Sequence, residues 1–246
     1  MSSPLLHSSD TPVSGVQIWT AHLESYSPAE IEELSALLDG GEQTRAARFH
    51  FARDRRHYVA SRGLLRRLLG IALDRPAPSL VFEYGAQGKP ALAAASSPSR
   101  VLEFNLAHSS GWAMFALAWD REIGIDLEAA TRLKRDVNAL PGLAARVLSP
   151  RELAVWQALP DDAARDAAFL RAWTRKEAYV KATGKGLFDE LGNIEVALDA
   201  ASPRPSLALR SIPQEGDIVR HWVLHDLSAP DGFAAALAVE QKTEPA

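Results

Sequence analysis

The chain has 246 residues, of which 47% are hydrophobic and 24% charged, as in ordinary folded globular proteins. Its net charge of −4 disfavours a protein whose main surface binds nucleic acid. The absence of cysteine excludes disulfides, thiolate metal sites and a cysteine nucleophile, and is compatible with a reducing compartment. Since we find neither a signal peptide nor a run of roughly 18 apolar residues, we expect a cytoplasmic protein without a membrane segment.

The N-terminal part is predicted to begin with a strand and a helix. Residues 1–14 are rich in Ser and Pro, and we expect them to be poorly ordered. The alternation in Val16–His22 predicts a strand. Ser27-Pro-Ala-Glu30 has the pattern of a capping box, which predicts a helix to about Leu38 that ends at Gly40-Gly41.

A strongly basic segment follows. Residues 42–75 contain nine arginines, no lysine and three acidic residues, and their apolar residues fit one amphipathic helix. A solvated helix face with long Arg side chains explains part of this pattern. The alternative is that some of the guanidinium groups bind phosphate, for which their planar geometry is well suited.

The middle of the chain combines short strands with polar residues. We predict a strand at residues 80–84, a Gly-rich loop at residues 85–90 that holds Lys89, and a strand from Val101 into a turn near Ser110. Taken alone, Asn105 and His108 are typical of that turn.

Two carboxylates lie in the next predicted hairpin. Its strands are Trp112 to Trp119 and Glu122 to Glu128, which turn at Asp120-Arg121. Asp126 and Glu128 then share one face of an apolar strand. Buried carboxylates must be solvated, paired with a basic group or bound to a cation, and hard oxygen ligands suit Mg²⁺.

The C-terminal part contains the longest predicted helix. Ser149-Pro-Arg-Glu152 predicts a helix to about Leu159, and a longer helix follows from about Asp161 to Gly184. Its residues Trp173, Glu177 and Lys181 stack at i, i+4 spacing. An exposed Glu–Lys pair beside a core Trp would also explain this face. We predict further strands at residues 193–198, 218–227 and 232–239.

The fold class follows from the order of these elements. Both parts run strand, helix, strand, so we expect an α+β protein of two similar α/β halves in a pseudo-twofold arrangement, with the active site in the cleft between them. The expected halves are residues 1–115 and 116–246. No Walker A and no Gly-x-Gly-x-x-Gly sequence is present. The basic segment and the carboxylates together indicate phosphoryl or pyrophosphate chemistry.

The chain resembles the 4′-phosphopantetheinyl transferase family, in its larger, monomeric type with two fused halves. Two segments look like the family's signature motifs: Gly124-Ile-Asp-Leu-Glu128, and Trp173-Thr-Arg-Lys-Glu-Ala-Tyr-Val-Lys181 with Gly184-Lys-Gly186. Three more segments resemble other motifs in the same order: Phe51-Ala-Arg-Asp54, Gly88-Lys-Pro90 and Asn105-Leu-Ala-His108.

The resemblance implies an enzyme that moves the phosphopantetheine arm of coenzyme A to a serine of an apo acyl or peptidyl carrier protein and releases 3′,5′-ADP. It implies Mg²⁺ bound by Asp126, Glu128 and Glu177. Glu177 is also a candidate base, directly or through a metal-bound water, and Lys181 would offset charge on the leaving group. Trp173 is expected to pack and to fix Glu177.

The positions expected to bind coenzyme A are Arg45, Arg48, Arg53, Lys89, Asn105, His108, Lys176 and Lys181. One departure from the family is Ala107, which stands where the family usually has Ser. The missing hydroxyl could be replaced by Ser109 or by backbone N–H groups of the turn.

Two other functions fit the same residues. A Mg²⁺-dependent hydrolase would use the carboxylates with water as the nucleophile, and a non-catalytic module would bind coenzyme A or nucleic acid through the basic segment. For the transferase we expect the carrier surface at Leu133 to Leu148 and the following helix. The positive charges expected there are Arg132, Lys134, Arg135 and Arg146.

Overall fold

Two antiparallel sheets form the frame of the protein in the computed structural model, which describes residues 6–11, 13–85, 87–93, 100–131, 140–184, 188–199, 209–211 and 222–241. The first sheet has the order β1-β2-β6-β5 and the second the order β10-β11-β7. Their strands are β1 (Leu6–Ser9), β2 (Val16–His22), β5 (Leu102–Ser109), β6 (Trp112–Trp119), β7 (Ile123–Ala129), β10 (Trp222–Leu227) and β11 (Phe233–Glu240). Two small ladders pair β3 (Phe82–Tyr84) with β4 (Pro90–Leu92) and β8 (Glu195–Val196) with β9 (Leu209–Ser211).

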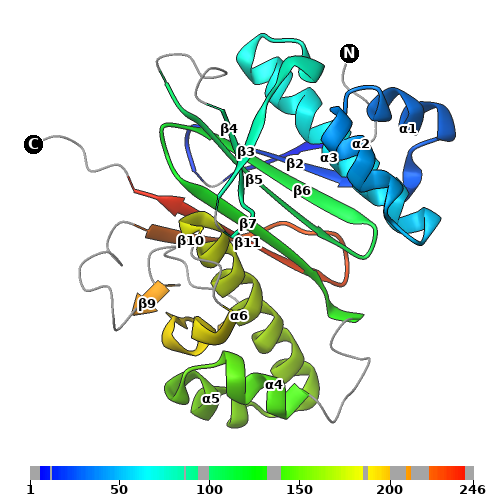
Figure 1. Ribbon diagram of the computed structural model, residues 1–246. Coiled ribbons are helices and arrows are strands. Elements are labelled where there is room, and N and C mark those ends of the chain that lie inside the picture. Colours follow the sequence, from blue (N-terminus) through cyan, green and yellow to red (C-terminus); the bar gives the residue numbers. More distant parts are fainter. Residues whose placement is uncertain are drawn as a thin grey trace, which may run out of the picture.

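Each sheet is covered by one helix of 22 residues. The helices are α1 (Pro28–Ser35), α2 (Gly40–Ala47), α3 (Ala52–Leu73), α4 (Leu140–Val147), α5 (Pro150–Gln157) and α6 (Asp162–Thr183). Leucines of α3 pack on Phe104 and Phe115 of the first sheet, and α6 packs on β11 of the second through Ala178 and Ala182 (Figure 1). The predicted α+β class with two halves is confirmed.

The two sheets meet at β5 and β7. The side chain of Asn105 accepts a hydrogen bond from the Ile125 N–H at 3.1 Å, and Ser109 Oγ accepts one from the Ala129 N–H at 3.2 Å. Beneath this junction one apolar cluster contains residues of both sheets, for example Met114 and Leu237. Polar side chains of β5 therefore contact the β7 backbone where the two sheets meet, and this junction positions the candidate site.

Several sequence predictions are corrected in the N-terminal half. Residues 6–9 form an edge strand that pairs with β2. Gly40 and Gly41 begin α2 instead of ending a helix, because Asp39 caps it by accepting a hydrogen bond from the Glu42 N–H at 2.8 Å. The basic segment thus forms two helices, α2 and α3, and not one.

The predicted hairpin of residues 112–128 is wrong. β6 pairs with β2 and β5, whereas β7 pairs with β11, so the chain crosses from one sheet to the other between them. The Asp120 carboxylate turns back to the first sheet, where it accepts a hydrogen bond from the Val101 N–H at 2.8 Å. The hairpin is instead β5–β6, which turns at Ser110 and Gly111, both with positive φ.

The remaining elements agree in kind with the sequence. Capping boxes begin α1 and α5, and α6 ends at Gly184 with φ 64°. The strand expected at residues 193–198 is reduced to β8, and β10 begins at Trp222, with residues 218–221 outside the described part. Among the described helices, none combines the length and apolar character that crossing a membrane requires.

Candidate active site

Asp126 and Glu128 lie on the face of β7 that α6 covers, and both are buried. Lys181 of α6 donates to Asp126 Oδ1 at 2.7 Å, whereas Asp126 Oδ2 is buried and has no hydrogen-bond partner among the described residues. Burial raises the pKa of the Asp126 carboxyl, and the Lys181 ammonium opposes this shift. The predicted face of the strand is confirmed, with Ile125 and Leu127 on the opposite, apolar side.

The packing of α6 on β7 depends on Gly124. A Cβ at this position would overlap the Ala178 carbonyl and the Ala182 N–H of α6. The glycine two residues before Asp126 therefore allows the helix backbone to approach the strand closely, which brings Lys181 within reach of Asp126.

The Glu128 side chain is fixed by a hydrogen bond from a residue of the first sheet. The Ser109 hydroxyl donates to Glu128 Oε2 at 3.0 Å, and both side chains are buried. Ala107, two residues earlier on β5, is 2% exposed within the apolar cluster at the sheet junction. The Ser109 hydroxyl, one of the expected replacements for a hydroxyl at position 107, is thus engaged with Glu128 and with the β7 backbone.

A first cavity of about 360 Å³ opens beside these residues. The N-terminal half lines it with Gly88, Lys89 and Asn105, and α6 lines it with Glu177 and Lys181. Lys89 reaches across the junction and donates to the Ala182 carbonyl at 2.8 Å. Five of the residues predicted from sequence thus meet here: Asn105, Lys89, Glu177 and Lys181 in the wall, and Asp126 through its ion pair with Lys181.

A second cavity of about 400 Å³ lies further along β5, lined by Arg45, His57, Tyr58 and His108 among others. The Arg45 guanidinium lies 5.5 Å from the centre of the Tyr58 ring. His57 Nε2 is 3.5 Å from Glu24 Oε1 and makes no hydrogen bond within the described part of the chain, and burial lowers the pKa of this ring. His57 was missed in the sequence because a lone His on an Arg-rich helix carries no distinctive signal.

The acidic residues at the junction of β7 and α6 are the candidates for holding Mg²⁺. Among the described residues, no three His, Asp or Glu side chains are close enough to form a metal-binding group. The buried, unpartnered Oδ2 of Asp126 nevertheless requires a positive or hydrogen-bonding partner, and Glu128 lies two residues away on the same face of β7. Oxygen donors of this kind fit Mg²⁺.

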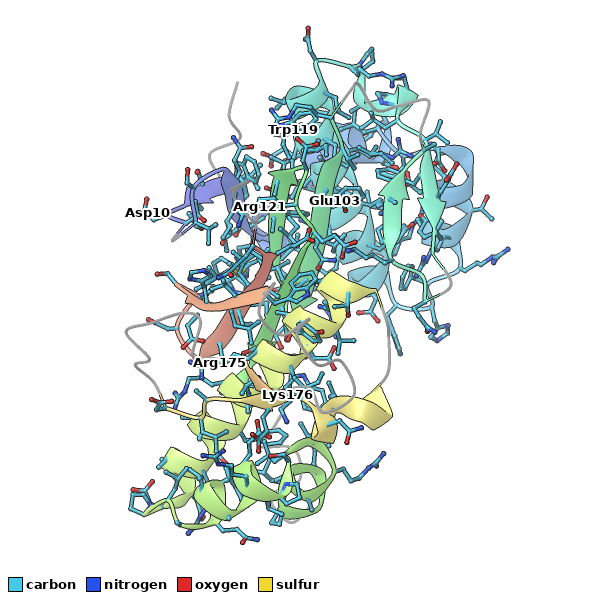
Figure 2. The ribbon with its side chains drawn as sticks, turned by 90° about the vertical axis from the view of Figure 1, so that its left-hand side faces the viewer. Asp10, Glu103, Trp119, Arg121, Arg175 and Lys176 are labelled. Carbon is cyan, nitrogen blue, oxygen red and sulfur yellow. The ribbon has the colours of Figure 1, made fainter. Side chains whose placement is uncertain are left out.

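Lys176 does not reach either cavity. Its ammonium is fully buried and donates to Glu152 Oε2 at 2.6 Å and to the carbonyls of Val147 and Leu191 at 2.7 and 2.9 Å. Figure 2 shows Lys176 and its neighbour Arg175 well below Glu103 of β5. The structure thus gives Lys176 a role in packing α6 against α4 and α5.

Four other arginines of the basic segment differ in their exposure. Arg48 and Arg53 are exposed, and Arg53 pairs with Asp54 at 3.5 Å. Arg62 and Arg66 are buried and bind Glu42. Of the Arg residues expected to bind coenzyme A, the structure brings only Arg45 into the wall of one of the two cavities described above.

Two family models match the chain. One, described as 4′-phosphopantetheinyl transferase, N-terminal, covers residues 24–119, and the other, the 4′-phosphopantetheinyl transferase superfamily, covers residues 122–238. The 4′-phosphopantetheinyl transferase HetI of Nostoc is 38% identical over 224 residues, which are 91% of this chain and 87% of that protein. The chain belongs to the 4′-phosphopantetheinyl transferase superfamily. It is an enzyme of the larger, two-domain type that carries out phosphopantetheinyl transfer.

More distant relatives are also similar to this transferase. The L-aminoadipate-semialdehyde dehydrogenase-phosphopantetheinyl transferase of Xenopus laevis is 30% identical over 74% of this chain and 62% of that protein. A solved structure of Helicobacter pylori holo-[acyl-carrier-protein] synthase in complex with coenzyme A is 24% identical, covers 48% of this chain and 99% of that chain, and has a TM-score of 0.36.

Proposed function

We propose that this transferase moves the 4′-phosphopantetheine arm of coenzyme A to a serine hydroxyl of an apo acyl or peptidyl carrier protein and releases 3′,5′-ADP, in a Mg²⁺-dependent reaction. The observation that carries the proposal is the junction of β5, β7 and α6. There the buried Asp126 pairs with Lys181 beside a cavity whose wall also contains Lys89 and Glu177.

Asp126 and Glu128, which share one face of β7, would hold the metal, and Glu177 of the cavity wall would have to move closer to become the third ligand. When bound, Mg²⁺ would neutralise charge on the pyrophosphate of coenzyme A. The unpartnered Asp126 Oδ2 supports this role. Lys181 is 31% exposed in its side chain and lines the cavity, so its ammonium can stabilise the charge that develops on the leaving phosphate.

Glu177 is our candidate for the base that accepts the proton of the carrier serine. It lies one helical turn before Lys181 and lines the same cavity. In this reaction the serine oxygen forms a bond to the phosphorus next to the pantetheine arm. The bond between this phosphorus and the bridging oxygen breaks, and that oxygen leaves with 3′,5′-ADP.

In this proposal the two cavities along β5 bind different parts of the coenzyme A molecule. The first cavity, with Lys89 and Lys181, would hold the pyrophosphate region. The second cavity, with Arg45 and His108, would hold the 3′-phosphate. Arg48 and Arg53 are exposed beside α2 and α3 and would contribute to this binding through their charge alone.

We propose that the enzyme acts as a monomer.

The carrier surface is proposed near α4. Of the basic residues expected there, Arg146 lies on α4, and residues 132–139 are outside the described part. Reversing the charge with Arg146→Glu should raise the KM for an acidic carrier by about tenfold and leave the affinity for coenzyme A unchanged. An unchanged carrier KM would place the carrier elsewhere.

Product analysis separates the transferase from a hydrolase that uses the same carboxylates. The protein is incubated with coenzyme A and Mg²⁺, with and without an apo carrier, and the nucleotides are separated by chromatography. The proposal predicts 3′,5′-ADP only when the carrier is present. Its formation without a carrier would favour the hydrolase, and coenzyme A binding that survives Glu177→Ala without any product would favour a binding module.

A further inference from the structure

A buried group of ion pairs joins α2 to α3, the two helices that also contribute Arg45 and Tyr58 to the second cavity. Glu42 of α2 is 4% exposed and accepts hydrogen bonds from Arg62 Nε and, at 2.5 Å, from Arg66 Nε. Arg66 is fully buried, donates to Asp39 Oδ2 at 2.6 Å, and also donates at 3.0 Å to two backbone carbonyls of residues 77–80. These arginines are therefore internal and are not ligands for phosphate.

The same group fixes helix α2. Glu42 forms a capping box with Asp39, in which each side chain accepts a hydrogen bond from the other residue's N–H at 3.0 and 2.8 Å. A helix of eight residues is not stable by itself, so its position and its rotation depend on such contacts. Arg45 follows Glu42 by three residues and is held over Tyr58 in the wall of the second cavity.

Arg62 extends the group to β3, the strand before the turn that holds Lys89. It donates to the Tyr84 hydroxyl at 2.7 Å, and its guanidinium lies 4.2 Å from the centre of the Phe82 ring. Both aromatic residues belong to β3, which leads into the turn closed by the hydrogen bond from Gly85 N–H to the Lys89 carbonyl at 3.0 Å. Lys89 lies in the wall of the first cavity.

We propose that Glu42, held by Arg62 and Arg66, is a positioning residue that sets Arg45 for the 3′-phosphate of coenzyme A, and that Arg62 joins this element to the turn that carries Lys89. The inference rests on the proposed binding of coenzyme A in the two cavities. Because Glu42 acts through Arg45, its loss should weaken ligands that carry a 3′-phosphate more than those that lack one.

Calorimetric binding of coenzyme A and of 3′-dephospho-coenzyme A tests this proposal. In Glu42→Gln the affinity for coenzyme A should fall about tenfold, while that for 3′-dephospho-coenzyme A should change less than about threefold. The matched control is Glu30→Gln, because Glu30 has the same capping-box position in α1 but is only half-buried and exchanges its hydrogen bonds with Ser27, outside any buried group of ion pairs. The control should bind both ligands as the wild type does.

A second variant covers the case in which Glu42→Gln does not fold. Asp39→Asn removes one charge from the group, and Asn caps helices as well as Asp does. The Asp39 side chain is 44% exposed, so this variant should fold and lose about threefold in coenzyme A affinity with the same selectivity. Wild-type affinities in the folded variants, or an equal loss for both ligands, would overturn the proposal.

The test is independent of the transfer reaction, since it needs no carrier protein. If the wild type prefers coenzyme A over its 3′-dephospho form and the variants lose that preference, the inference stands even if no carrier is modified. If the wild type binds both ligands with equal affinity, Arg45 does not bind the 3′-phosphate and the inference fails.

Discussion

Gly124 of β7 packs directly against the backbone of α6 at Ala178, and no side chain fits between the two elements. This contact sets the height of the helix above the strand. Asp126 on the strand and Lys181 on the helix are then close enough to form an ion pair at 2.7 Å. The geometry of the active site thus depends on a glycine that has no chemical role of its own.

Gly124→Ala should therefore damage both stability and activity. The added methyl group would push α6 away from β7 at an expected cost of about 1–3 kcal/mol in the free energy of unfolding, and activity should fall further because Lys181 moves from Asp126. Thermal unfolding and initial rates measure the two effects. Gly142→Ala is the control, since Gly142 lies in α4 with open space around it and alanine there should stabilise by about 0.5–1 kcal/mol. A Gly124→Ala variant with wild-type stability and rate would contradict the packing described here.

Two lysines of α6 should respond differently to replacement by Ala. Lys176→Ala leaves Glu152 buried without its ammonium partner, which should lower the free energy of unfolding by about 3–5 kcal/mol. Lys181→Ala removes a partly exposed side chain at the cavity and should lower turnover about 100-fold. Denaturant unfolding and steady-state kinetics of both variants test the contrast. Full turnover in folded Lys181→Ala would remove its catalytic role.

Ser109→Ala tests how Glu128 is held. Without the hydroxyl, Glu128 Oε2 loses its hydrogen bond from β5, so the Mg²⁺ concentration for half-maximal activity should rise about tenfold, while the rate at saturating Mg²⁺ recovers. A magnesium titration of activity measures both quantities. An unchanged titration curve would show that Glu128 does not need this contact.

The second cavity should bind coenzyme A more tightly at lower pH through His57. Burial lowers the pKa of this ring below its usual 6.5, so the free ring is neutral at pH 7.5. A nearby phosphate favours the charged ring and raises its pKa, so binding takes up a proton and strengthens as the pH falls. The charged groups that act on the ring are Glu24, Arg53, Asp54 and Arg56.

The measurement compares wild type with His57→Gln from pH 8 to pH 6. The comparison removes the effect of the phosphate itself, whose second pKa is about 6. The affinity of the wild type for coenzyme A, divided by that of His57→Gln, should grow as the pH falls. A ratio that does not change with pH would show that the His57 ring does not face the phosphate.

The strength of local signals explains how much the sequence could predict. Capping boxes and Gly184 mark helix ends through bonds between near neighbours, so the starts of α1 and α5 and the end of α6 were predicted well. The pairing of β7 was predicted wrongly, because two neighbouring strands with a short connection have the pattern of a hairpin. In the structure β7 pairs instead with β11, more than 100 residues later. Strand pairing at this separation depends on the whole core and leaves no local mark.

The same difference between local and long-range contacts applies to the candidate site. The alternation in β7 was sufficient to predict that Asp126 and Glu128 share a face, and helical spacing placed Glu177 and Lys181 on one side of α6. Residue type did not reveal that Lys176 is buried against Glu152, since Lys176 and Lys181 look alike in sequence. The internal role of Arg62 and Arg66 likewise depends on Glu42, which lies 20 and 24 residues away.

The measurement that tests the central claim most directly is the intact mass of an apo carrier protein after incubation with this enzyme, coenzyme A and Mg²⁺. We predict that acyl or peptidyl carriers gain the mass of one phosphopantetheine, and that EDTA or Asp126→Ala abolishes the gain. Carriers of both kinds that keep their apo mass, while coenzyme A binds, would contradict the proposed reaction.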